Sequence, residues 1–418
     1  MMNPVISLAI KKICLLTFLL LPPFFQAHAL FDGALSFAPQ VNLAAMQSED
    51  EFYSNSKPKK LLLGEAQLPL TLTLFDSVFV EANYILRFNR SEPFQTQNTY
   101  SDKLQKLNIN FQNDDLFLKI GRQDYVRANR DFVIYYGSPK YIDARPSTSV
   151  NGLLHGNALG LLSYELMAAK QTDEIAFESY QPTIYGASLQ LGSPKLAYLD
   201  LFYYYADNNG MHFDKHLTVW GGGVNFNLND AIKASFYGFA NNGDEAFKLY
   251  YITARNEYKG YGFTGDLAFM SEGDYFTNTY TLGFFYTPKP YLAIAQNMDM
   301  GVIFGSTDGA PMSPNDPAVN FNYLDLLIYS LKINITAKDF LENARLDLNI
   351  YDFSRGADTV DNKHIGSELD LKLAYDNGRF GAQIFYGFFV SGEALKHIGQ
   401  DNKKIHKLGA NMSMRFAF

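Results

Sequence analysis

The last twelve residues, Lys407-Leu-Gly-Ala-Asn-Met-Ser-Met-Arg-Phe-Ala-Phe418, alternate between two kinds of side chain. One set is apolar and comprises Leu408, Ala410, Met412, Met414, Phe416 and Phe418. The other set is small or polar and comprises Gly409, Asn411, Ser413, Arg415 and Ala417. A period of two places successive side chains on opposite faces of a β-strand. The pattern therefore predicts a strand with one face toward lipid and one toward a wet interior.

The same alternation recurs at 78–86, 344–351 and 367–375, with leucine, valine and isoleucine on one face. The other face is charged. Charged side chains are costly in a dry core but not against water, so these positions favour a water-filled barrel. The face on which a residue lies, odd or even along the strand, is its parity. The residues that parity places on the charged face, our pore-lining candidates, are Arg87, Glu81, Arg345, Asp347, Glu368, Asp370, Lys372 and Arg415. For each arginine, an ion pair that braces the wall is the alternative role.

The N-terminus has the features of a secretory signal. Lys11 and Lys12 precede an apolar run over 13–21, and Ala27-His28-Ala29 offers small residues for cleavage. The apolar run is too short to span about 30 Å of hydrocarbon as a helix. We therefore expect a cleaved signal peptide at 1–29 and one domain at 30–418. The sole cysteine, Cys14, lies in the signal, so no disulfide is expected.

The composition is rich in aromatic residues without being hydrophobic on average. Aromatic residues make up 15% of the chain, while the mean hydropathy is -0.14. No apolar run of 18 residues follows the signal, which excludes helical spans. A barrel reconciles these facts because only every second residue faces lipid. We predict an all-β fold, a transmembrane antiparallel up-and-down β-barrel of about 18 strands (roughly 16–20); a large soluble secreted domain is the alternative.

Connections between the expected strands alternate between short and long. The expected short turns, assigned to the periplasm, are 192–194, 229–230, 259–260, 289–290, 337–339 and 377–378. The expected external connections are 207–214, 241–244, 271–275, 305–322, 354–363 and 391–405. The stretch 126–180 is ambiguous: 146–154 and 157–168 form an extra hairpin, or the stretch folds over or into the lumen. An even strand number places both termini in the periplasm.

Three motifs resemble a known family. They are Leu118-Lys-Ile-Gly-Arg-Gln123, followed by a loop with Arg127, Arg130 and Arg145; Ile365-Gly-Ser-Glu-Leu-Asp370; and Tyr386-Gly-Phe-Phe389 with Gly392. Together they resemble the alginate-export family of outer-membrane porins. The resemblance implies a monomeric barrel and a passive conduit for polar or anionic solutes, including oligo- or polysaccharides. It implies that arginines and acidic residues line a constriction. The chain is shorter than the exporter and lacks an assured counterpart of its full arginine ladder.

Two local features have competing interpretations. Arg122 shares parity with Leu118 and Ile120, so it points at lipid unless a bulge at Gly121 turns it into the lumen; otherwise it reaches the outer interface. We favour the lumenal position and count Arg122, Arg127, Arg130 and Arg145 among the pore-lining candidates. The run Gly221-Gly222-Gly223 predicts a bulge or kink in the wall, because no helix follows that would bind phosphate.

The remaining expectations concern partners and other classes of function. Terminal Phe418, with Phe416, matches the strand that outer-membrane assembly machinery recognises. We expect that machinery, outer-membrane lipid and lipopolysaccharide as partners, and no nucleic acid because no basic stripe exists. No cofactor or metal site is expected. A hydrolase is disfavoured because the histidines lack a Gly-x-Ser-x-Gly partner. A sealed barrel that displays loops as an adhesin or receptor is the main alternative.

Overall fold

The computed structural model describes most of the chain. The described residues are 34–48, 59–92, 95–127, 132–137, 149–172, 182–209, 213–249, 252–289, 325–338, 342–356, 363–394 and 402–416. The expected signal peptide at 1–29 lies outside them. Within these ranges, no helix is both long and apolar enough to cross a bilayer.

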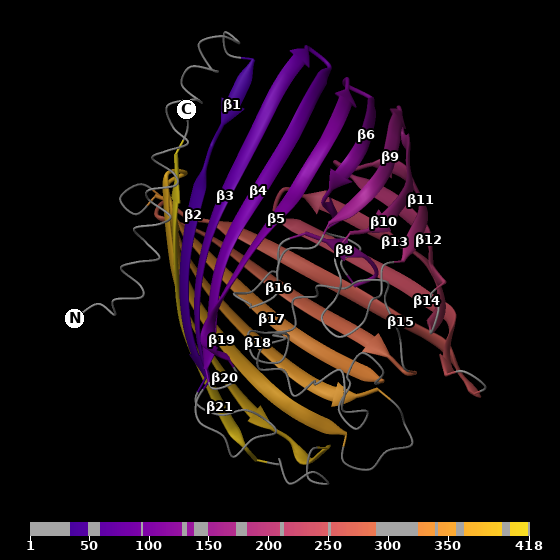
Figure 1. The fold of residues 1–418 in the computed structure, drawn as a ribbon. Coiled ribbons are helices and arrows are strands. Elements are labelled where there is room, and N and C mark those ends of the chain that lie inside the picture. The colour runs from indigo at the N-terminus through magenta and orange to yellow at the C-terminus, as the bar shows by residue number, and fades with distance from the viewer. Residues whose placement is uncertain are drawn as a thin grey trace.

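The described chain forms one closed antiparallel barrel (Figure 1). Nineteen strands share its sheet, and β1 (Leu35–Phe37) only extends β2 along β3, so the wall has 18 strands (19 − 1). The wall strands are β2 (Gln40–Ser48), β3 (Lys59–Phe75), β4 (Val78–Glu92), β5 (Gln95–Gln112), β6 (Leu116–Gln123), β9 (Val150–Leu159), β10 (Leu162–Gln171), β11 (Thr183–Ser193), β12 (Ala197–Asn209), β13 (Phe213–Asn229), β14 (Ile232–Leu249), β15 (Ile252–Glu272), β16 (Phe276–Thr287), β17 (Leu326–Ala337), β18 (Ala344–Arg355), β19 (His364–Asp376), β20 (Phe380–Ser391) and β21 (Lys404–Arg415). The expected barrel is confirmed.

The last strand closes the barrel. β21 pairs with β20 on one side and with β2 on the other, from Gln40↔Arg415 to Ser48↔Lys407. Beyond the strand, the Phe416 amide donates to the Pro39 carbonyl at 2.9 Å. Closure gives every wall strand a hydrogen-bonded neighbour on both sides, which is the condition for strands to stand in lipid. Phe418 lies outside the described residues.

Tight turns join the strands at one end of the barrel, where the first and last described residues of the wall also lie. Three of these turns repeat one device: the side chains of Asn113, Asn229 and Asn377 each accept a hydrogen bond at 2.8 Å from the amide three residues later. Such Asx turns fix the reversal without help from the rest of the fold. This end corresponds to the periplasmic end of outer-membrane barrels, which has short turns.

Four expected connections are wrong, all between 241 and 290. The pair 259–260 lies inside β15, and 241–244 lies inside β14. The stretch 271–275 holds a tight turn at the periplasmic end, and Lys289 follows the end of β16 at the opposite end of the barrel. The cause is strand length: β14 and β15 have 18 and 21 residues. Their ladder continues beyond the roughly 9–11 residues that a membrane requires, through residues that otherwise favour turns.

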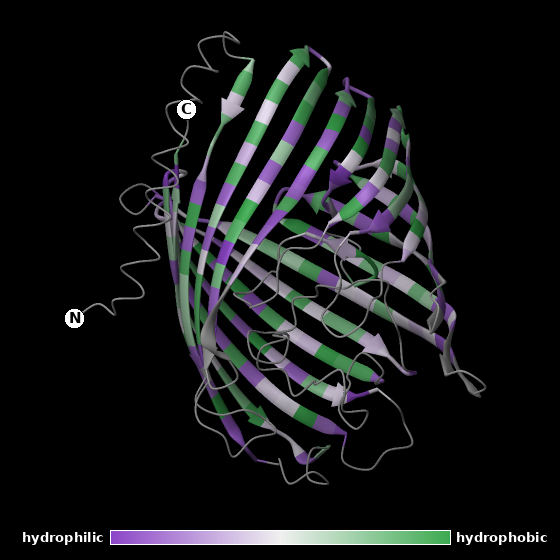
Figure 2. Ribbon diagram, in the orientation of Figure 1, coloured by the Kyte–Doolittle hydropathy of each residue, from purple (hydrophilic) through white to green (hydrophobic). Residues whose placement is uncertain are grey.

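The outward face carries an apolar belt. Hydrophobic and polar residues alternate along the wall strands (Figure 2). Large apolar side chains are exposed at every second position, as in Leu369, Leu371 and Leu373 of β19, whereas Glu368 and Asp370 between them are buried. A soluble monomer rarely exposes so large an apolar surface. The parity predicted for β19 is therefore confirmed, and the belt indicates that this surface lies in a membrane.

The ambiguous stretch 126–180 contains both of the expected alternatives. β9 and β10 form a wall hairpin, close to the predicted one. Residues 124–127 and 132–137, which we call the lumenal segment, fold inside the barrel and contain a small antiparallel pair, β7 (Tyr125–Val126) and β8 (Tyr135–Tyr136). β8 lies within the outline of the barrel in Figure 1. The strand number stays at 18 because the segment adds no wall strand.

Candidate functional site

A β-bulge anchors the start of the lumenal segment. The register between β4 and β5 shifts so that Gln105 has no partner on β4. Gln105 Nε2 donates to Asp124 Oδ1, and Lys106 Nζ lies by Asp124 Oδ2, both at 2.7 Å. A bulge re-aims side chains that would otherwise alternate between the two faces. Two consecutive residues thus hold one carboxylate at the point where the chain leaves the wall.

A buried carboxylate of β10 forms the central contact. Glu165 faces inward and accepts hydrogen bonds from the Tyr125 hydroxyl at 2.5 Å and from Arg127 Nε at 3.0 Å. Arg127 also pairs with Glu165 through its terminal nitrogen. The guanidinium lies 4.8 Å from the centre of the Tyr125 ring, a cation–π distance. We call this contact the Glu165 latch.

The electrostatics of the latch keep Arg127 charged. Burial lowers the pKa of the Arg127 guanidinium, but the Glu165 carboxylate more than offsets this, and the net pKa is raised. On the far side of the latch, the Tyr125 hydroxyl lies 2.9 Å from that of Tyr204 on β12. Removing one partner of a buried ion pair costs about 3–5 kcal/mol, since it leaves the other charge uncompensated. The latch is therefore a strong local restraint.

Aromatic packing holds the second half of the lumenal segment. The Phe132 ring lies 4.7 Å from that of Phe239, 5.9 Å from Tyr237 and 6.3 Å from Phe202. Val133 and Ile134, next in the chain, are fully buried. The Tyr136 hydroxyl then donates to Gln171 at 3.0 Å. The segment is thus fixed at both ends against the inner faces of β10–β14 and fills that side of the lumen.

The three glycines of β13 make room for this packing. Register continues without a shift through Gly221, Gly222 and Gly223 on both sides, so the expected bulge or kink is wrong. A Cβ on Gly221 would lie 2.7 Å from the Phe202 ring, and one on Gly223 would lie 2.4 Å from the Tyr237 ring. The rings that receive Phe132 therefore occupy the space above two of these glycines.

Replacing Gly223 by alanine should destabilise the barrel. The added methyl group meets the Tyr237 ring and the Phe236 carbonyl at about 2.5 Å, and overpacking of this kind typically costs about 1–3 kcal/mol. The matched control is Gly238→Ala on β14, where the nearest atoms lie 3.5 Å away in the Phe263 ring. Urea unfolding of the two variants measures the difference. Equal midpoints would show that the aromatic packing yields freely.

The candidates on β3–β5 lie in the wall ladder. Arg87 is buried on the inner face, with Nε 3.9 Å from Glu65 Oε2. Glu81 accepts a hydrogen bond from Asn110 Nδ2 at 3.2 Å. Both side chains have partners on directly neighbouring strands. This arrangement corresponds to the wall-bracing role that parity left open.

The candidates on β18 and β19 form a denser group. Asp347 accepts from Asn334 Nδ2 at 2.8 Å and pairs with Arg345 Nε at 2.9 Å. Lys372 Nζ lies 3.9 Å from the same carboxylate. Glu368 and Asp370 are buried on the inner face of β19. The alternation of side chains thus predicted the shared inner face of Arg345, Asp347 and Lys372, and the structure places the three in one cluster.

The remaining candidates differ from the expectation. Arg122 pairs across the sheet with Leu107 and Asn151, both exposed on the outward face, and register is unbroken at Gly121. The expected bulge is therefore wrong, and Arg122 faces outward, where its Nε donates to Ser149 Oγ at 3.0 Å. Gly121 instead absorbs a φ of 119° within a regular ladder. Arg130 and Arg145 lie outside the described residues.

Arg415 lies at the periplasmic rim. Its two terminal nitrogens each lie 3.0 Å from an oxygen of Asp376, a bidentate pair that ties β21 to the turn after β19.

The lumenal site also contains residues that were not among the sequence candidates: Tyr125, Phe132, Tyr136 and Glu165. The glycine run of β13 was a signal for this site, because glycines leave space on the inner face of the wall that large neighbouring side chains must fill. Among the described residues, no group of three or more histidine, cysteine or acidic side chains is placed to hold a metal.

Comparison with known proteins identifies relatives of the fold only. The sequence matches no protein-family model and no curated protein. Solved structures match over 92% of this chain. They include Pseudomonas aeruginosa OccK5 (OpdH; 10% identity, TM-score 0.59, 98% of that chain), Acinetobacter baumannii OccAB3 (10%, 0.61, 99%) and P. aeruginosa OccK8 (OprE; 12%, 0.57, 98%). These neighbours are outer-membrane channels with 18-strand barrels, so the chain shares their fold.

Proposed function

We propose that the protein is a porin of the outer membrane of Gram-negative bacteria, through which polar solutes, anions above all, diffuse passively. The shared fold and the apolar belt support the location. The observation that carries the channel role is the Glu165 latch, because a wall that only displayed loops has no need to hold a narrowing segment inside it. Wet, charge-lined constrictions are where channels select ions.

The exposure of the lumenal ion pairs supports a preference for anions. In three pairs the cation faces the lumen and the anion is covered: Arg127 is 32% exposed against 11% for Glu165, Arg345 48% against 7% for Asp347, and Arg355 30% against 5% for Asp325. At these three pairs a passing solute meets guanidinium groups more than carboxylates. Guanidinium groups bind carboxylates and phosphates bidentately.

The experiment that tests the proposal is conductance of the purified protein in planar bilayers. We expect discrete openings, a reversal potential in a salt gradient that shows anion preference, and block by an acidic oligosaccharide more than by a neutral one of equal length. The acidic oligosaccharide represents the cargo class implied by the resemblance to alginate exporters. A folded barrel without conductance would overturn the proposal in favour of a sealed scaffold that displays loops.

Neutralising two cations of the β18–β19 cluster should reduce anion preference. In Arg345→Gln/Lys372→Gln, Asp347 keeps its bond from Asn334 and the new glutamine amides can still donate to it, so the barrel is expected to fold with reduced stability while the lumen loses two charges. We expect the anion-to-cation permeability ratio, obtained from the reversal potential, to fall several-fold. The control is Arg415→Gln, where Arg415 and Asp376 are similarly exposed at 40% and 50%. An equal shift from this control would argue against selection at the cluster.

A further inference from the structure

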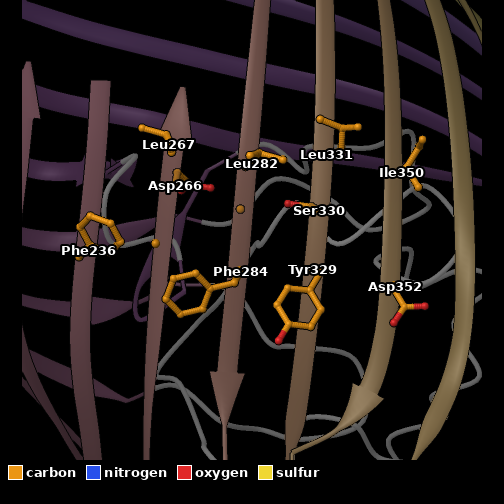
Figure 3. A pocket seen from close by; sticks show the side chains of 12 residues that line it. Phe236, Asp266, Leu267, Leu282, Phe284, Tyr329, Ser330, Leu331, Ile350 and Asp352 are labelled. Carbon is orange, nitrogen blue, oxygen red and sulfur yellow. The ribbon is translucent and has the colours of Figure 1, made fainter. Parts of the chain in front are cut away.

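The outward face of β14–β18 carries a hollow bounded by two rows of side chains (Figure 3). Each row consists of residues paired directly across neighbouring strands. The first row is Phe236, Gly265, Phe284, Tyr329 and Asp352. The second row is Leu267, Leu282, Leu331 and Ile350. The hollow has a volume of about 460 Å³, within the roughly 300–1,000 Å³ typical of ligand sites.

A glycine in the aromatic row explains the hollow. A Cβ on Gly265 would lie 2.7 Å from ring atoms of both Phe236 and Phe284. The two rings therefore lean over Gly265 from either side instead of standing away from the wall. The surface of the aromatic row is therefore closer to the backbone at Gly265 than at its neighbours. Leu282 and Tyr329, each 57% exposed, project from the wall beside this point. The result is a shallow channel with an aromatic and an aliphatic side.

A polar group marks one end of this channel. Asp352 accepts hydrogen bonds from Ser367 Oγ at 2.9 Å and pairs with His364 Nε2 at 3.0 Å. The Asp352 side chain is still 47% exposed. Asp352 lies three residues from the outer end of β18, whereas Phe236 lies four residues from the periplasmic end of β14. Because barrel strands are tilted, the groove runs obliquely along the outward face, from the outer interface toward the periplasmic end.

We propose that this outward channel, the wall groove, binds one acyl chain of an outer-leaflet lipid. Its walls belong to the apolar belt, so hydrocarbon is the medium that reaches it. An ionised carboxylate accepts hydrogen bonds and donates none. Asp352 therefore selects a chain that carries a donor near its polar end, an amide N–H or a hydroxyl, and disfavours a phosphate at that point. The inference requires the membrane location proposed above and not the identity of the solute.

The test is lipid retention measured by native mass spectrometry on the full protein extracted in detergent and stripped of lipid. One probe is lipid A, whose acyl chains are amide-linked and hydroxylated; the other is phosphatidylcholine, which has no N–H or O–H donor on its chains or its headgroup. We expect one retained lipid A per barrel and weaker retention of the phospholipid. Leu282→Trp fills the wall groove and Asp352→Ala removes the acceptor, and each should weaken lipid A retention roughly ten-fold, or about 1.4 kcal/mol.

The matched control is Leu371→Trp, on the outward face of β19 and outside the groove, which should retain lipid A as the parent does. Ile350→Trp is a second filling variant should Leu282→Trp fail to fold. Equal retention in parent and filled barrels overturns the proposal, as does equal retention of the two lipids with no effect of Asp352→Ala. Conductance separates this outcome from the proposed function, because lipid loss with normal openings leaves the porin role intact.

Discussion

Replacing Glu165 by alanine is expected to release the lumenal segment and raise the open-channel conductance. The substitution deletes the acceptor of the Tyr125 hydroxyl and the partner of Arg127 together. Arg127 then remains charged without its partner in a half-buried position, which costs less than the roughly 3–5 kcal/mol of a fully buried pair because water screens part of the charge. The strain is relieved most easily if residues 125–127 move away from the inner face of β10 and take the guanidinium into open water. Single-channel recording should show larger, noisier openings.

Two further variants separate the latch from charge alone. Glu165→Gln keeps an acceptor for Tyr125 but removes the ion pair, so its conductance should lie between those of the parent and Glu165→Ala. In Glu165→Ala/Arg127→Ala neither charge is left without its partner. The change in conductance should therefore be smaller than the sum of the changes in the two single variants. Glu81→Ala is the control, because Glu81 lies on β4 and contacts Asn110, away from the lumenal segment. Unchanged conductance and noise in Glu165→Ala would show that aromatic packing alone retains the segment.

The barrel was predictable from sequence because its physical cause is periodic. Each wall strand separates lipid from water, so Leu369, Leu371 and Leu373 alternate with charges that no dry sheet would bury. Parity therefore also placed Arg345, Asp347 and Lys372 on one face. These contacts lie within β18 or between β18 and its neighbour β19, whose ladder runs without a shift from Ala344↔Tyr375 to Phe353↔Gly366.

The lumenal site was not predictable in the same way. Tyr125 and Glu165 are 40 positions apart, and Phe132 meets Phe239 from a segment with no alternation of its own. Their contact depends on where a non-wall segment lies in a closed barrel, which periodicity cannot encode. The two glycine sites differ from the prediction for one reason. The sequence predicts a break in register at Gly121 and at Gly221–Gly223, whereas Gly121 adopts an unusual φ and Gly223 gives space to a ring, both in an unbroken ladder.

Arginine at the two faces of β20 should separate sharply in stability. Ile384 is 57% exposed in the middle of the strand, and its cross-strand neighbours Leu373 and Ala410 are apolar, so the row lies in hydrocarbon. An arginine near the midplane costs about 2–4 kcal/mol. Gln383, one residue earlier, faces inward between Ala374 and Asn411. An arginine there reaches the lumen and should cost far less.

Equilibrium urea unfolding in lipid vesicles, with heat-modifiable migration as the folding check, compares Ile384→Arg with Gln383→Arg. The two positions are adjacent and receive the same side chain, so the added charge and the residue introduced are matched. The difference isolates which solvent each face meets. A loss of stability in Ile384→Arg alone requires hydrocarbon outside and water inside, the condition on which both the channel and the wall groove depend. Equal losses would mean that both faces are dry, and equal tolerance would mean that the apolar belt never enters a membrane.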